Sequence, residues 1–221
     1  MKRFLTASVA IGAILAGSPA FAEDTIKIGI LVALEGAFAD GGKDGVRNVE
    51  LALRQVNNMV AGKKIETVVA PTDTTPDTTI RQARKLIEQD KVDFIVSPRS
   101  GSEGIAMRDY AKTIPDKTVI NGISGALETT WVDPAPNFYR FNLDGSQWGY
   151  GLGSYVVKEK GWKKIATVAA DYSFGYTNFL GFAVDFCKSG GDIVERFWVP
   201  LGSSDFGGVI AALPDDVDAI Y

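Results

Sequence analysis

The chain has 221 residues and a formal net charge of −4, with 23 Lys and Arg against 27 Asp and Glu. An acidic balance without a basic run argues against nucleic acid or an anionic membrane surface as a partner. The sequence contains no histidine, which excludes Ser-His-Asp and Cys-His catalysis and His-based metal sites within it.

The first 22 residues have the layout of a secretory signal peptide. Lys2 and Arg3 precede an apolar stretch over 4–17, and the segment ends in Ala20-Phe21-Ala22. This pattern predicts export and cleavage before Glu23, which changes the net charge from −4 to −6 because two bases and no acids are lost. A retained membrane anchor is the alternative, but the apolar run is too short for a spanning helix. No cysteine stands at the cleavage point to carry a lipid.

From Ile26 onward, strands and helices are predicted to alternate. In chain order they are a strand at 26–34, a helix at 46–60, a strand at 65–70, a helix at 77–89 after Thr75-Pro76, a strand at 92–96, a helix at 103–114, a strand at 117–122, a helix at 149–160, a strand at 163–170, a helix at 177–189 and a strand at 192–199. Alternation with short connections predicts an α/β fold with parallel sheets and right-handed crossovers.

The end of the chain and its single cysteine lead to two further expectations. Tyr221 lies inside the strand-like run 217–221, so we expect the chain to be the N-terminal portion of a longer protein. Cys187 has no partner for an intramolecular disulfide. It is predicted to be a small core residue near Phe182 and Phe186, and a reactive thiol is the alternative.

The loop SPRSGSEG at 97–104 follows a predicted buried strand and has two interpretations. S-G-S-E-G lies one residue away from the G-x-S-x-G elbow of serine hydrolases, but no histidine and no nearby S-x-x-K is present to activate Ser100 or Ser102. The other interpretation is a holding loop, since a helix N-terminus attracts an anion. Ser100 and Glu103 also fit a capping box, which can coexist with binding. Arg99 is either a partner for an anionic ligand or a solvated side chain.

Three more loops follow predicted strands and are rich in small or aromatic residues, at 35–45, 121–128 and 171–176. In open α/β sheets, ligands bind outside the carboxyl ends of the strands, where such loops converge. Tyr172 and Phe174 either close over an organic ligand or pack a helix onto its sheet. Trp148 is predicted to lie at the junction between two lobes, as packing rather than as a ligand contact.

Several segments together resemble branched-chain amino acid-binding proteins, the substrate-binding components of ABC importers. The similar segments are IKIGILVALEGAFADGGKDGVRNVELALRQVN, PTDTTPDTTIRQARKLIEQDKVDFIV, YRFNLDGSQWG, DYSFGYTNFLGF and VPLGSSDFGGVIAALP. The resemblance implies a two-lobe type I periplasmic-binding fold with parallel sheets flanked by helices. We therefore expect a first lobe over 23–143 and an incomplete second lobe over 144–221, after the signal peptide 1–22.

The resemblance also implies where a ligand binds. Ser100, Gly101 and Ser102 match the wall that binds the ligand's carboxylate. Ser124, Gly125 and Ala126 match the wall that meets its ammonium, and Tyr172 or Phe174 matches an aromatic residue from the second lobe. Pro98, Arg99 and Leu127 depart from the family pattern, so an amide, a urea-like compound or an aromatic acid is an alternative to an unmodified leucine-type ligand.

These patterns predict a periplasmic solute-binding protein that is not an enzyme. It captures a small amino-acid-like, amide or carboxylate ligand between two lobes and delivers it to an ABC transporter permease. We expect a monomer without a cofactor, a metal ion or a nucleic acid partner. A sensory module of the same fold that feeds a receptor is one alternative, and a secreted serine hydrolase is another.

Overall fold

The computed structural model describes residues 25–221, so the predicted signal peptide lies outside the described residues. The first sheet has six strands in the order β2-β3-β1-β4-β5-β6, and every pair is parallel except β2 with β3. Its strands are β1 (Thr25–Ala33), β2 (Met59–Val60), β3 (Lys63–Thr72), β4 (Phe94–Ser97), β5 (Thr118–Asn121) and β6 (Phe138–Arg140). The second sheet has three parallel strands in the order β8-β7-β9. They are β7 (Lys164–Ala170), β8 (Asp192–Val199) and β9 (Ala219–Ile220).

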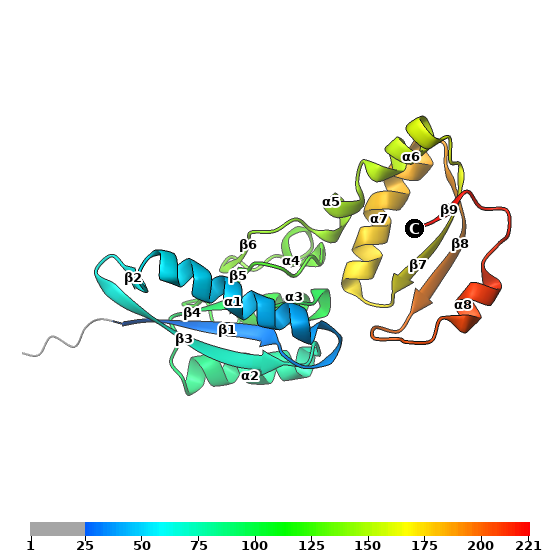
Figure 1. Ribbon diagram of the computed structural model, residues 1–221. Helices are drawn as coiled ribbons and strands as arrows, with labels where there is room; N and C mark the ends of the chain where they lie inside the picture. The colour runs from blue at the N-terminus through cyan, green and yellow to red at the C-terminus, as the bar shows by residue number, and fades with distance from the viewer. Residues whose placement is uncertain (1–24) are drawn as a thin grey trace, which may run out of the picture.

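Helices connect these strands and flank both sheets. They are η1 (Gly36–Phe38), α1 (Ala39–Gln55), α2 (Pro76–Glu88), α3 (Gly101–Ala111), α4 (Glu128–Trp131), α5 (Gly145–Gly149), α6 (Leu152–Lys160), α7 (Ser173–Lys188) and α8 (Gly207–Ala212). Figure 1 shows two lobes, each with its own sheet, joined through the segment that contains α5. This arrangement confirms the predicted two-lobe α/β fold. Among the described helices, none is long and apolar enough to cross a membrane.

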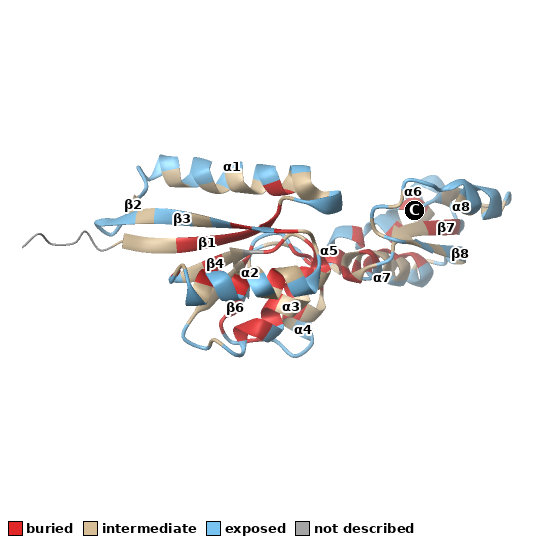
Figure 2. Cartoon of the chain, turned by 90° about the horizontal axis from the view of Figure 1, so that it is seen from below, coloured by how far each residue is buried: buried red, intermediate tan, exposed pale blue. Residues whose placement is uncertain are grey.

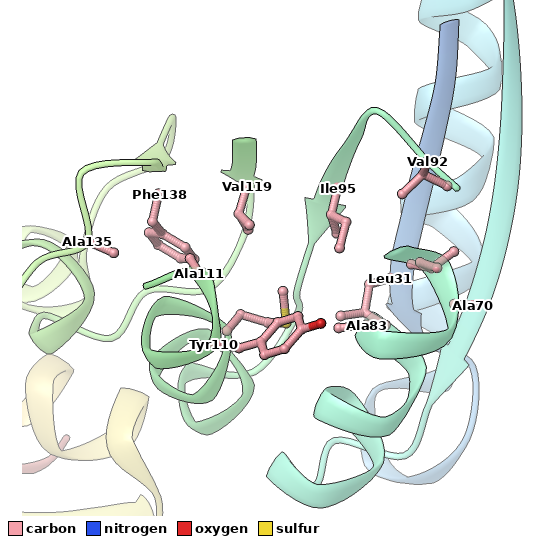
Figure 3. Close-up of a cluster of buried hydrophobic side chains, with 12 residues drawn as sticks. Leu31, Ala70, Ala83, Val92, Ile95, Tyr110, Ala111, Val119, Ala135 and Phe138 are labelled. Atoms are coloured by element: carbon pink, nitrogen blue, oxygen red, sulfur yellow. The ribbon is translucent and has the colours of Figure 1, made fainter. Parts of the chain in front are cut away.

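The main core lies on one face of the first sheet. Figure 2 shows α1 on one side of this sheet, and α2 and α3 on the other. The buried cluster joins the sheet to α2 and α3 (Figure 3), and its members are Leu31, Ala70, Ala83, Leu86, Val92, Ile95, Met107, Tyr110, Ala111, Val119, Ala135 and Phe138. A second cluster in the other lobe contains Val156, Ile165, Phe182 and Phe186. Each lobe thus has its own hydrophobic core.

Helix α1 begins earlier and ends earlier than predicted. The expected helix covered 46–60, but α1 starts at Ala39, within the Gly-rich loop. Gly42 explains the difference, because a Cβ at this position would overlap the carbonyl oxygen of Ala33, so only glycine lets the helix lie this close to β1. The helix stops at Gln55, after which Asn57 and Asn58 have positive φ angles and lead into β2.

Two other expectations in the second lobe were wrong. The predicted helix 149–160 begins later, as α6 at Leu152, because Gly151 has a φ of 91° and separates it from α5, to which Gly149 belongs. Cys187 is exposed rather than buried. On α7, Phe182 and Phe186 are four residues apart and share the face that packs on the sheet. Cys187 is one residue further round the helix and therefore points away from the core.

Candidate functional site

The candidate site is a cleft where the loops that follow strands of both sheets meet. Its volume is about 220 Å³, and its walls are formed by Phe38, Arg99, Ile123, Gly125, Trp148, Tyr172 and Phe174. These residues follow β1, β4, β5 and β7 or lie on α5. The carboxyl ends of parallel strands are where ligands bind in α/β folds. A hollow of about 710 Å³ lies beside α2, but all its walls belong to that helix and its C-terminal cap, so it is a surface groove.

Aromatic rings form most of the wall. The Trp148 and Phe174 rings meet edge to face, with centroids 5.4 Å apart. Tyr172 lies 6.2 Å from Phe174 and 6.0 Å from Phe38, centroid to centroid, so the rings form a continuous series across the two lobes. Trp148, which was predicted to lie at the junction between the lobes as packing, packs on Phe174, lines the cleft and has a largely exposed side chain. These rings offer flat apolar contacts to a small organic molecule.

Ser100 forms the N-cap of α3, and the capping box is complete. Its hydroxyl accepts a hydrogen bond from the Glu103 amide at 3.2 Å, and Glu103 Oε2 accepts one from the Ser100 amide at 2.8 Å. The Ser100 hydroxyl also donates to the carbonyl of Thr74 at 3.3 Å. Ser100 is 2% exposed, and Ser102 is half-buried and absent from the cleft wall. The Ser100 hydroxyl therefore caps the N-terminus of α3.

Glu103 holds this loop to the rest of the first lobe. Its side chain is completely buried, and its Oε1 accepts hydrogen bonds from the hydroxyls of Thr72 at 2.5 Å and Thr79 at 3.0 Å. Three elements, β3, α2 and α3, thus meet at one carboxylate. Because a buried charge is tolerated only when it is well hydrogen-bonded, this network makes the start of α3 a rigid platform.

The residues of the second predicted wall, Ser124, Gly125 and Ala126, do not all face the cleft. Gly125 faces the cleft, whereas Ser124 and Ala126 are completely buried. Asn121 holds the loop, because its amide nitrogen donates to the Ser124 carbonyl at 2.8 Å and its oxygen accepts from the Ser124 amide at 2.9 Å. A Cβ at Gly104 would overlap the Ser124 hydroxyl, so this hydroxyl lies against α3 and not in the cleft.

The two lobes touch at positions where only glycine fits. A Cβ at Gly101 would overlap the Ser173 hydroxyl and come within 3.0 Å of the Phe174 backbone nitrogen. A Cβ at Gly125 would lie 2.9 Å from Cδ2 of the Phe174 ring. The start of α7 is therefore docked directly on the start of α3 and on the loop after β5. Of the predicted residues, the structure brings Gly101, Gly125, Tyr172 and Phe174 together at this junction.

Three residues of the cleft wall were not among the predicted contacts, namely Phe38, Ile123 and Trp148. Phe38 lies in the Gly-rich segment 35–45, and its position soon after a buried strand could have marked it as a candidate ligand contact.

Burial raises the pKa of the Tyr172 hydroxyl, and the nearby charge of Arg99 partly offsets this increase. Among the described residues, no group of three or more Cys, Asp or Glu side chains is placed to hold a metal ion.

Comparison with known proteins identifies the family. The family model for periplasmic binding proteins matches residues 25–221. The chain belongs to this family. Its members bind solutes, which supports the prediction of a binding protein rather than an enzyme, and the resemblance seen in the sequence is confirmed.

Within this family, the chain is similar to Leu/Ile/Val-binding protein homologues and to solute-binding proteins of ABC transporters. A Leu/Ile/Val-binding protein homolog 6 from Brucella abortus (strain 2308) is 24% identical over 218 residues, which cover 97% of this chain and 54% of the relative. An ABC transporter solute-binding protein from Rhodopseudomonas palustris BisB5, solved with 3,4-dihydroxybenzoic acid, is 31% identical with a TM-score of 0.82, covering 90% of this chain and 54% of that one. One from R. palustris, solved with 4-hydroxybenzoate, is 25% identical with a TM-score of 0.81, covering 89% and 53%. The chain thus spans about half the length of these relatives.

Proposed function

We propose that this periplasmic binding protein is the solute-binding component of an ABC importer. In this proposal, residues 1–22 direct export to the periplasm, and the lobes over 23–143 and 144–221 close on a small amino-acid-like, amide or carboxylate solute. The solute is then handed to a membrane permease. The similar proteins from R. palustris, which are described as ABC transporter solute-binding proteins, support this role.

The observation that carries the proposal is the aromatic cleft between the lobes. Its volume of about 220 Å³ is below the roughly 300–1,000 Å³ of pockets that hold drug-sized ligands. A single small solute is therefore the expected occupant. Gly125, Tyr172 and Phe174 are the predicted residues in its wall, whereas Gly101 lies under α7 at the junction of the lobes. Ser100, Ser124 and Ala126 are buried, and Ser102 is outside the wall.

Closure follows from walls that belong to both lobes. A solute that contacts Gly125 in one lobe and Phe174 in the other stabilises the closed arrangement over an open one. Since a ligand shifts such an equilibrium only through its different affinity for the two states, contacts made from both sides are what drive closure. No covalent step is required.

A thermal-shift screen of the full chain tests this function. The panel contains branched-chain amino acids, small amides, urea and aromatic carboxylates. Ligand at about 100 times its dissociation constant stabilises the protein by roughly 2.7 kcal/mol, which corresponds to an increase in Tm of about 5–10 °C. Small-angle scattering of the same samples is expected to show a smaller radius with the active solute. A panel without any shift, or a radius that stays constant at saturation, would contradict the proposal.

A further inference from the structure

Arg99 is part of the cleft wall and follows β4, which ends at Ser97. Its guanidinium carbon lies 5.7 Å from the centroid of the Phe38 ring. The same group lies against Gly41 of α1, where a Cβ would come within 2.6 Å of it. The side chain is half-buried and faces Tyr172, whose titration it influences. Arg99 is thus held in place by packing on two sides and presents its charge to the cleft.

Within residues 25–221, the Arg99 side chain forms no ion pair and no hydrogen bond, and its guanidinium lies over the Phe38 ring. The other residues of the cleft wall are Phe38, Ile123, Gly125, Trp148, Tyr172 and Phe174, none of which is acidic. A half-buried guanidinium among apolar walls interacts more strongly with an anion than a solvated one does. Its planar fork matches the two oxygens of a carboxylate.

The start of α3, the carboxylate wall implied by the family resemblance, is already occupied. The Ser100 hydroxyl accepts a hydrogen bond from the Glu103 amide and donates its own hydrogen to the Thr74 carbonyl at 3.3 Å, so that hydrogen is not free for a solute carboxylate. Gly101 is covered by the second lobe, since the Ser173 hydroxyl and the Phe174 backbone lie directly on it. Among the residues of the cleft wall, Arg99 is the one that carries a positive charge for a carboxylate. The same arrangement leaves an ammonium group of a solute without an acidic partner in the cleft wall.

We propose that Arg99 binds the anionic group of the solute and that the cleft thereby selects aromatic carboxylates. The carboxylate pairs with the guanidinium, and the ring lies among Phe38, Tyr172 and Phe174. This inference rests on the proposed solute-binding function and names the ligand chemistry of the same cleft. Within residues 25–221 the cleft wall offers an ammonium group apolar rings and a cation and no acidic side chain, which disfavours an amino acid.

Isothermal titration of the full chain with four probes tests this inference: benzoate, its neutral isostere benzamide, L-leucine and L-phenylalanine. We expect benzoate to bind at least 10-fold more tightly than the other three. Arg99→Gln is expected to weaken benzoate binding by about 10- to 100-fold, because a charge-assisted hydrogen bond is lost, and to leave benzamide binding nearly unchanged. Arg99→Lys keeps the charge without the fork and is expected to retain part of the preference.

Arg196→Gln is the matched control, because Arg196 also lies over an aromatic ring, Phe179, at 5.8 Å but outside the cleft wall. It is expected to bind benzoate as the unsubstituted chain does, and thermal unfolding without ligand verifies that both Gln variants are folded. Unchanged benzoate affinity in Arg99→Gln overturns the inference while the solute-binding function stands. A preference for L-leucine or L-phenylalanine also overturns it. If none of the four probes binds, the ligand class is wrong, and the wider thermal-shift panel decides separately whether the chain binds another solute.

Discussion

Replacement of Gly101 by alanine is expected to weaken closure of the lobes and to leave folding of the first lobe intact. The new Cβ would overlap the Ser173 hydroxyl and lie 3.0 Å from the backbone nitrogen of Phe174. The hydroxyl can rotate away, but the backbone of α7 has to move by about 0.4 Å to reach an ordinary contact of 3.4 Å. Overpacking of this kind costs about 1–3 kcal/mol, so the ratio of closed to open molecules is expected to fall about 5- to 150-fold.

The first lobe itself is expected to tolerate this change. Gly101 is the first residue of α3, where alanine favours the helix by up to about 1 kcal/mol. The closest contact in the first lobe is the Ala126 side chain, at 3.3 Å from the new atom. The strain therefore acts between the lobes, and a weaker solute affinity without loss of the main unfolding transition is the expected signature.

Scattering, titration and thermal unfolding measure this effect, with Gly122→Ala as the control. Gly122 lies in the loop after β5, and a Cβ there would meet nothing within 4 Å. The control is expected to keep the affinity of the unsubstituted chain. Gly101→Ala is expected to show a larger radius of gyration with solute and a dissociation constant that is 5- to 150-fold larger. If Gly101→Ala binds its solute as tightly as the control does, the contact between α3 and α7 is not part of closure.

The other predictions concern the supports of the cleft. Glu103→Ala is expected to lower the free energy of unfolding by about 3–5 kcal/mol in urea titrations, since two threonine hydroxyls and the Ser100 amide lose a buried acceptor; a loss below 1 kcal/mol would show that water replaces it. For Asp144, burial raises the pKa, but hydrogen bonds from Ser146 and Gln147 and the charge of Arg140 outweigh burial, so the net pKa is lowered. Its stabilisation is therefore present above the unfolded pKa of about 3.9 and is lost as the pH falls through the folded value. Asp144→Asn should be about 1.5–3 kcal/mol less stable than the unsubstituted chain at pH 7, with a difference that shrinks below pH 4; a difference that does not change with pH refutes this assignment. Phe174→Ala should weaken binding of the active solute at least 10-fold in titrations, because the ring that joins both walls is removed, and unchanged affinity would contradict this role.

Local patterns were sufficient to predict the order of elements and the capping of α3. Apolar β-branched runs predicted β1, β4 and β7, because strands buried on both faces need apolar residues at every position. The Ser100-Glu103 pair predicted the capping box, which is a contact within four residues. Helix α1 was displaced in the prediction because its first turns contain glycines with low helix propensity, and only the contact of Gly42 with Ala33 explains them.

The sequence predicted which loops form the candidate site, but not which of their side chains line the cleft. Sequence reasoning located the loops after β4, β5 and β7, because parallel strands bring their carboxyl ends to one edge. It could not determine which side chains in those loops face the cleft. Ser124 and Ala126 turn inward beneath α3, whereas Phe38 and Trp148 line the wall. In a helix or strand, the periodicity of the sequence indicates which side a residue faces. A loop has no such period, so the direction of its side chains cannot be predicted from the sequence.

The sequence by itself determined the alternating α/β architecture, the family resemblance and the exclusion of histidine chemistry, because these depend on composition and on contacts between near neighbours. The tertiary structure decided which residues are available to a solute. Docking of α7 on α3 covers Gly101, and packing of Phe38 and Gly41 holds Arg99 beside the cleft. Each of these contacts joins residues that are far apart in the chain, so their geometry follows only from the packing within the first lobe, for Arg99, and between the two lobes, for Gly101.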